Sequence, residues 1–136
     1  MTQQEIVSYW IGKARDELDS ANIMFNANKH LYAGFMCHQA IEKALKARYI
    51  YLKDDRQPYE HNLERLSKMT DLFDKMTEEQ RNTMRKLVPL YINARYEDYK
   101  NVMAELLTSQ YCKKLILDTE VLLTWILHSM TQRADS

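Results

Sequence analysis

The scarcity of glycine and proline is the feature that most restricts what this chain can fold into. Each residue occurs only twice in 136 residues, where average usage would give about nine glycines and about seven prolines. Sandwiches and barrels need many tight turns, which these two residues supply, so an all-β fold is not expected. A glycine-rich phosphate-binding loop is not expected either. The chain is therefore expected to be helical.

The spacing of apolar residues predicts several amphipathic helices. Apolar side chains recur at steps of three or four over most of the sequence, as one face of a helix requires. The expected helices cover residues 3–28, 31–52, 63–69, 77–92 and 108–130. Thr77 and Gln80 fit a capping box that opens the fourth of these, and Pro89 should break or kink it near residues 85–88. Residues 97–100 are polar and are expected to be irregular.

These helices predict an all-α fold, namely an up-and-down antiparallel bundle of four to five helices. Residues 1–130 are expected to form a single domain, with residues 131–136 as a polar tail. The stretch from Leu115 to Leu127 is apolar on nearly every side, so it belongs at the centre of the bundle or under another chain. It contains two carboxylates and is too short to cross a bilayer, so no membrane association is expected.

Charge and cysteine usage narrow the classes of function. Lysine plus arginine and aspartate plus glutamate number 19 each, so the formal net charge is zero. Wholesale electrostatic binding of nucleic acid is therefore not expected, although the sequence leaves room for a local basic patch. Cys37 and Cys112 lie in separate apolar segments, which predicts buried thiols in a reducing compartment. No short-spaced Cys/His metal motif and no signal-peptide pattern occur, so we expect a cytoplasmic protein without metal or cofactor.

Four motifs, in order along the chain, resemble those of one known family. They are Trp10, Ala14, Asp16, Leu18 and Ala21 in the first helix, the block at residues 38–47, His61-x-Leu63-x-x-Leu66, and Ala94-Arg95-Tyr96. On these residues the chain resembles the HEPN domain (higher eukaryotes and prokaryotes nucleotide-binding), in its small stand-alone prokaryotic type. The resemblance covers about residues 5–128. It implies an all-α bundle, frequent homodimers and roles in nucleotide or RNA transactions, often in toxin–antitoxin-like modules with a minimal nucleotidyltransferase as partner.

The ribonuclease motif of the family is incomplete in this sequence. In ribonuclease members, four to six residues separate an arginine at the position of Arg95 from a histidine; the arginine would stabilise a phosphate and the histidine would move a proton. The corresponding positions here hold Lys100, Asn101 and Val102. Lysine is a poor proton shuttle near neutral pH unless its pKa is lowered. We therefore expect no catalytic residue set, and metal-independent ribonuclease activity is the weakest alternative.

Six residues are the candidate ligand-binding residues. They are Gln39, Lys43, Arg95, Tyr96, Tyr99 and Lys100. An arginine among aromatic side chains can clamp a phosphate and stack on a base, and a polar strip on the second helix can line a cleft. The alternative is structural: the polar strip would be a buried network that fixes helix register, and the tyrosines would fill space between helices.

Two other polar groups have a structural interpretation. Four residues separate Arg56 from His61, which matches the spacing of the ribonuclease motif, but such a match is common by chance. His61 is instead expected to fix its loop through a hydrogen bond. Glu42 and Lys46 have the spacing of a favourable helix ion pair, which is interpreted as a solvated surface pair with Lys46 on a wet side of the helix.

Two classes of function follow. In the first, the chain is a HEPN-like module that binds a nucleotide or an RNA end, as a homodimer or with a nucleotidyltransferase partner. In the second, it is a structural bundle without a ligand, and its last helix pairs with a second copy or with that partner. The sequence leaves both open, because the first rests on resemblance and a fold by itself does not fix function.

Overall fold

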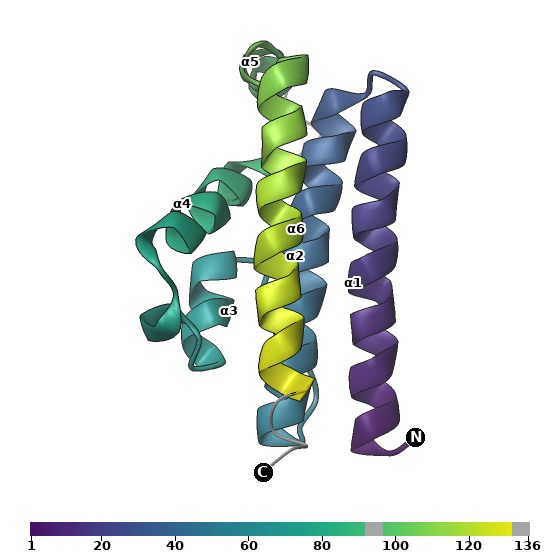
Figure 1. Cartoon of the computed structure of the whole chain (residues 1–136), viewed down its shortest axis with the longest axis vertical. Helices are drawn as coiled ribbons and strands as arrows, with labels where there is room; N and C mark the ends of the chain where they lie inside the picture. Colours follow the sequence, from purple (N-terminus) through teal and green to yellow (C-terminus); the bar gives the residue numbers. More distant parts are fainter. Residues whose placement is uncertain (92–96, 132–136) are drawn as a thin grey trace.

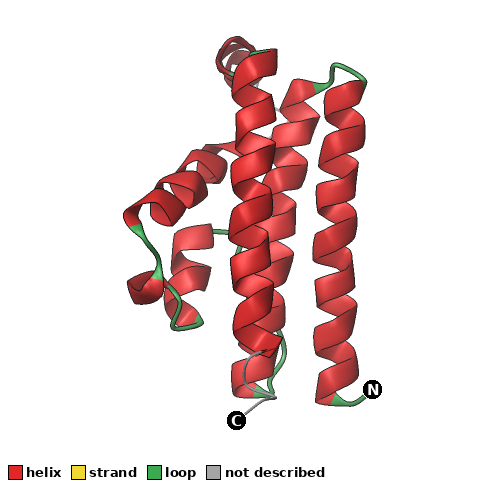
Figure 2. Ribbon diagram, in the orientation of Figure 1, coloured by secondary structure: helices red, strands yellow, loops and turns green. Residues whose placement is uncertain are grey.

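The computed structural model describes the backbone of residues 1–91 and 97–131, and the side chains of residues 1–91 and 101–130 (Figure 1). The helices are α1 (Gln3–Asn26), α2 (His30–Lys53), α3 (Leu63–Met69), α4 (Glu78–Leu87), α5 (Glu97–Leu106) and α6 (Ser109–Thr131), with single 3-10 turns at Phe73–Lys75 and Val88–Leu90. Figure 2 shows no strand in these residues. The predicted all-α class is confirmed.

Local signals in the sequence set most of the helix ends. Thr77 accepts a hydrogen bond from the backbone N–H of Gln80, whose side chain accepts one from the backbone N–H of Thr77, so the predicted capping box is confirmed. Helix α4 ends at Leu87, two residues before Pro89, and continues as a 3-10 turn. The predicted break is therefore confirmed, since proline lacks the N–H that the next helical turn would use.

The prediction for residues 97–100 is wrong. Their backbone forms the first turn of α5. The sequence argument relied on apolar spacing, which this polar stretch lacks. The segment Glu97–Leu106 nevertheless contains good helix formers, including Ala104, Glu105 and Leu106, and has neither glycine nor proline. The helix preference of the individual residues therefore accounts for this helix, which the spacing of apolar residues does not reveal.

Contacts between helix ends show how the long helices run. The Gln3 amide at the start of α1 donates to the backbone oxygen of Ile50 at 2.8 Å, near the end of α2, so these two helices are antiparallel. Helix α6 runs in the same direction as α2, because His30 contacts the Leu107 oxygen at one end and Arg48 contacts Ser129 at the other. The segment from α3 to α5 returns the chain between them, and α3 and α4 lie to one side of α6 (Figure 1).

The core lies between α2 and the helices around it. Helix α2 contributes more fully buried residues than any other described helix, and its closest packing is against α1. Ala14 and Ala21 are fully buried on α1, and small side chains at such positions let two helices approach closely. The largest fully buried side chains of the core include Ile41, Leu45, Leu63, Leu66, Met84, Leu87 and Ile126.

The two cysteines are buried, free thiols, as the sequence predicts. Burial raises the pKa of Cys37 to about 12 and the pKa of Cys112 to about 11, because a thiolate would lose its hydration. Both side chains therefore remain neutral thiols near neutral pH, and they pack as small apolar groups.

Helix α6 is partly central and partly uncovered. Leu122 and Ile126 are buried, as expected for a central helix. Leu117 and Val121, one turn apart, are 55% and 66% exposed. These two side chains form apolar surface on α6 that no described part of the chain covers. In the described part of the chain, no helix is long and apolar enough to span a bilayer.

Candidate functional site

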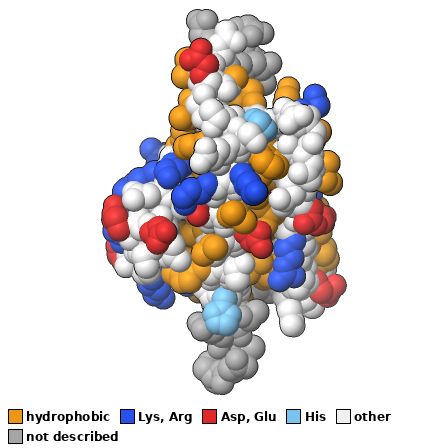
Figure 3. All heavy atoms as spheres, turned by 45° about the horizontal axis from the view of Figure 1, so that its top comes forward, with side chains coloured by type: hydrophobic (Ala, Val, Ile, Leu, Met, Phe, Trp, Pro, Cys, Tyr) orange, Lys and Arg blue, Asp and Glu red, His pale blue; other side chains and the backbone are white. Residues whose placement is uncertain are grey.

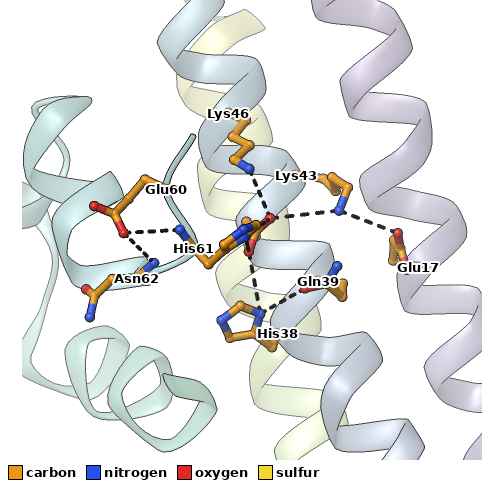
Figure 4. A network of polar contacts seen from close by, with 9 residues as sticks. Glu17, His38, Gln39, Lys43, Lys46, Glu60, His61 and Asn62 are labelled. Carbon is orange, nitrogen blue, oxygen red and sulfur yellow. Dashed lines mark hydrogen bonds and ion pairs between the residues drawn. The ribbon is translucent and has the colours of Figure 1, made fainter. Parts of the chain in front are cut away.

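A buried glutamate on α2 organises the polar groups of the second helix. The side chain of Glu42 is only 2% exposed. Its carboxylate accepts hydrogen bonds from Lys46 Nζ at 3.1 Å and from His61 Nδ1 at 3.1 Å (Figure 4). His38 and Lys46 lie one turn before and one turn after Glu42, so a continuous helix places all three on one face. The carboxylate is thus bound by a cation of its own helix and by a histidine of the following loop.

Lys46 corrects the sequence-based interpretation of this pair. The Lys46 side chain is 6% exposed, so the Glu42–Lys46 pair is buried and is not a solvated surface pair. The loop that follows α2 covers it. Asp54 ends α2 in the left-handed conformation, with φ at 48°, and the chain then returns along the helix and brings His61 against Glu42. The spacing of residues within a helix does not reveal that a later loop will lie against this pair.

The loop is itself held by hydrogen bonds. Glu60 Oε2 accepts from the backbone N–H groups of His61 and Asn62, at 3.1 Å each. Asn62 then caps α3 through its side-chain oxygen, which accepts from the Arg65 N–H at 3.0 Å. The hydrogen bonds that orient Glu60 lower its pKa. The prediction that His61 fixes its loop by a hydrogen bond is confirmed.

An exposed tyrosine adjoins the two histidines. The ring of Tyr91 stacks on His61, with centroids 4.8 Å apart and planes 14° apart. Its centroid lies 5.0 Å from that of His38. Burial raises the pKa of Tyr91, and the nearby charge of Glu42 adds to this, so the phenol keeps its proton near neutral pH. We call His38, Gln39, Glu42, Lys43, Lys46, His61 and Tyr91 the Glu42 cluster.

The charge state of His38 follows from its burial. Loss of hydration lowers the pKa of His38, and this outweighs the hydrogen bond to Gln39 and the charge of Glu42, which both act to raise it. The side chain is therefore neutral near pH 7. Gln39 Oε1 lies 3.1 Å from His38 Nδ1, and the tautomer with its proton on that nitrogen donates to the amide oxygen.

Lys43 is the cation of the cluster with the loosest pairing. Its Nζ lies 3.8 Å from Glu17 on α1 and 3.9 Å from Glu42, both longer than a hydrogen bond. Figure 4 shows Lys43 between the two helices. The Lys43 ammonium therefore makes two long ion pairs, whereas the Lys46 ammonium is hydrogen-bonded to Glu42.

The structure describes only part of the predicted site. Gln39 and Lys43 lie together in the Glu42 cluster. Arg95 and Tyr96, and the side chains of Tyr99 and Lys100, lie outside the described residues, so their roles stay predictions. Sequence reasoning did not select Tyr91 as a site residue. Its position three residues before the Ala94-Arg95-Tyr96 motif was the available signal.

The cluster shows which chemistry is available. Lys46 and His61 occupy the Glu42 carboxylate, which leaves it little capacity to act as a base. Among the described residues, no group of three or more His, Cys, Asp and Glu could hold a metal ion. The partly accessible groups are an aromatic ring face, an amide and one loosely paired ammonium. Such groups are suited to binding a planar, phosphorylated molecule.

Comparison with known proteins decides the family. The family model described as the HEPN domain matches residues 7–130, nearly the whole chain. The chain belongs to the HEPN family. No curated protein sequence matches this HEPN chain.

Two solved structures share the HEPN fold seen here. One is the crystal structure of TT1696 from Thermus thermophilus, with a TM-score of 0.71 and 22% identity, over 90% of this chain and 96% of that one. The other is ST0689, described as an archaeal HEPN homologue, with a TM-score of 0.68 and 20% identity, over 91% of this chain and 97% of that one. At these identities the similarity establishes the fold alone, so the function has to be argued from the residues of the site.

Proposed function

We propose that this HEPN chain binds a nucleotide or an RNA end beside the Glu42 cluster. The observation that carries the proposal is the exposed ring of Tyr91, which stacks on His61 in the same cluster that contains Lys43. Any of the bases can stack on an aromatic ring, whatever the nucleotide sequence, and an ammonium group binds a phosphate. The proposed ligand-binding residues are Gln39, Lys43, Arg95, Tyr96, Tyr99 and Lys100.

The buried part of the cluster supports binding by holding the exposed part in place. Glu42 fixes His61, and His61 in turn stacks on Tyr91. A ring that is already ordered loses less conformational entropy when a base packs against it. Arg95 follows Tyr91 by four residues in the sequence and would supply the bidentate phosphate contact that lysine cannot make.

Equilibrium binding of a fluorescent, 5′-phosphorylated oligoribonucleotide tests the proposal. Arg95→Ala and Lys43→Ala are each expected to weaken binding by about tenfold, since each removes a charged contact to the phosphate. Arg56→Ala and Lys53→Ala are matched controls, because both side chains are exposed, lie outside the cluster and change the net charge equally. The controls should stay within about twofold of the unmodified chain. Full affinity in both Arg95→Ala and Lys43→Ala would contradict the proposal.

A second candidate function is assembly, which the exposed apolar residues of α6 favour. Leu117 and Val121 could pair with a second copy of the chain or with a nucleotidyltransferase partner. Sedimentation velocity tests the homodimer. The chain is expected to sediment as a dimer, and Val121→Glu is expected to yield monomers, since it would bury a charge. Val102→Glu on α5 is the matched control, because Val102 is also an exposed valine. A chain that stays monomeric at high concentration would exclude the homodimer.

A further inference from the structure

A hollow of about 510 Å³ lies between the end of α4 and the first half of α6. This volume is within the range of small-molecule sites. The residues lining it that matter most are Lys86, Tyr111, Lys113, Lys114, Leu117 and Asp118. Figure 3 shows the face of the molecule that includes α6, where Lys and Arg side chains gather to one side with apolar side chains between them.

The hollow carries uncompensated positive charge. Three lysines from two helices line it, together with a single carboxylate, Asp118. That carboxylate is already bound by Lys114 Nζ at 2.8 Å, and the charge of Glu79 on α4 also acts on Lys114. Within the described part of the chain, Lys86 and Lys113 make no ion pair. Two ammonium groups at one hollow in a chain of zero formal net charge produce a local field that favours an anion.

The other lining groups are apolar or can donate a hydrogen bond. The half-buried Tyr111 and the exposed Leu117 provide apolar surface beside the lysines. Thr108 also lines the hollow, and its hydroxyl oxygen accepts the Tyr111 N–H at 3.2 Å, so its own hydrogen remains available to donate. This combination fits an anion that is attached to a flat, weakly polar group better than it fits a small inorganic ion.

We propose that this hollow is a second binding site, which takes a phosphate group attached to a nucleobase. Lys86 and Lys113 hold the phosphate from the two helices, and Tyr111 packs against the base. A free mononucleotide and the phosphorylated end of an RNA share this chemistry. The site shares no residue with the Glu42 cluster.

Amide chemical shifts of the full-length, nitrogen-15-labelled chain test the proposal. AMP is expected to shift the amide signals of Lys86, Tyr111 and Lys113 in a saturable manner. Adenosine, which lacks the phosphate, should bind at least about tenfold more weakly. A 5′-phosphorylated oligoribonucleotide and its 5′-hydroxyl counterpart then distinguish the two sources of phosphate. Tighter binding of the phosphorylated oligonucleotide than of AMP would assign the site to an RNA end, and the reverse order to a free nucleotide.

Matched lysine variants distinguish specific binding in the hollow from nonspecific attraction by surface charge. The double variant Lys86→Gln/Lys113→Gln is expected to weaken AMP binding by about tenfold. Lys53→Gln/Lys75→Gln removes the same charge at exposed positions on other elements and should change it by less than about twofold. Equal losses in the two double variants would overturn the proposal. So would equal binding of AMP and adenosine, or the absence of shifts around Tyr111.

The outcome can be told apart from that of the proposed function. Ligand-induced shifts confined to Gln39 and Lys43 would overturn the second site while supporting binding at the Glu42 cluster. Shifts at Tyr111 and Lys113 that persist in Lys43→Ala would support the second site whatever happens at the cluster.

Discussion

Replacing Glu42 with alanine is expected to lower the free energy of unfolding by about 3–5 kcal/mol. The substitution leaves the Lys46 ammonium buried without its partner and removes the acceptor of His61. An unpaired buried charge costs far more than the pair gains, because neither water nor another anion replaces the lost contact. The loss of His61 pairing should also release the loop from α2.

Urea denaturation followed by circular dichroism measures this effect, and Glu64→Ala supplies a matched control. Glu64 on α3 also accepts a hydrogen bond from a lysine four residues on, Lys68 at 3.4 Å, and one from Arg85 at 3.1 Å. Those side chains are partly exposed, so water replaces the lost contacts, and the cost should stay within about 1 kcal/mol. A Glu42→Ala variant as stable as Glu64→Ala would show that Lys46 reaches water in solution.

A double variant identifies the cause of the Glu42 effect. Glu42→Leu/Lys46→Met replaces the buried pair with apolar side chains of similar size. Replacing such a pair is often neutral or stabilising, so the double variant is expected to be more stable than Glu42→Ala. If it is no more stable than Glu42→Ala, an unpaired Lys46 is not the cause of the loss, since both variants lose the contact between Glu42 and His61.

Replacing Ile41 with alanine is expected to lower the free energy of unfolding by about 2–5 kcal/mol. Ile41 is fully buried on α2 among the largest core side chains, next to the residue that organises the polar cluster. Removing its side chain loses apolar burial and leaves a cavity that rigid helices fill only in part.

Ile23→Ala is the matched control for Ile41→Ala. Ile23 lies on α1, and its side chain is 65% exposed. The chemical change and the gain in helix preference are the same in both variants, so the difference between them isolates burial. Ile23→Ala should change the free energy of unfolding by no more than about 0.5 kcal/mol. Similar losses for the two variants would contradict the packing around α2.

Some features of this chain could be predicted because their causes are local. The helix start at Thr77 and the stop before Pro89 depend on groups within a few residues of each other. The burial of Cys37 and Cys112 follows from the apolar segments that contain them. The wrong prediction for residues 97–100 also has a local cause. The spacing of apolar residues does not detect a polar helix, which only the helix preferences of its residues would have revealed.

The candidate site depends on contacts between distant residues, and this is why the sequence missed its centre. Glu42 meets His61 across 19 residues of sequence, and Tyr91 reaches both histidines from a third segment. Lys46 has the sequence signature of a surface lysine, and only its surroundings in the folded chain make it a buried one.

The sequence by itself determined that this protein is an all-helical member of the HEPN family. The scarcity of glycine and proline, the helical period and the family motifs are all properties of the chain before it folds. Only the tertiary structure decided that the Glu42 carboxylate is enclosed, and that Lys86 and Lys113 share one hollow. The physical reason is that burial and charge compensation depend on which surfaces meet, and no local pattern specifies that.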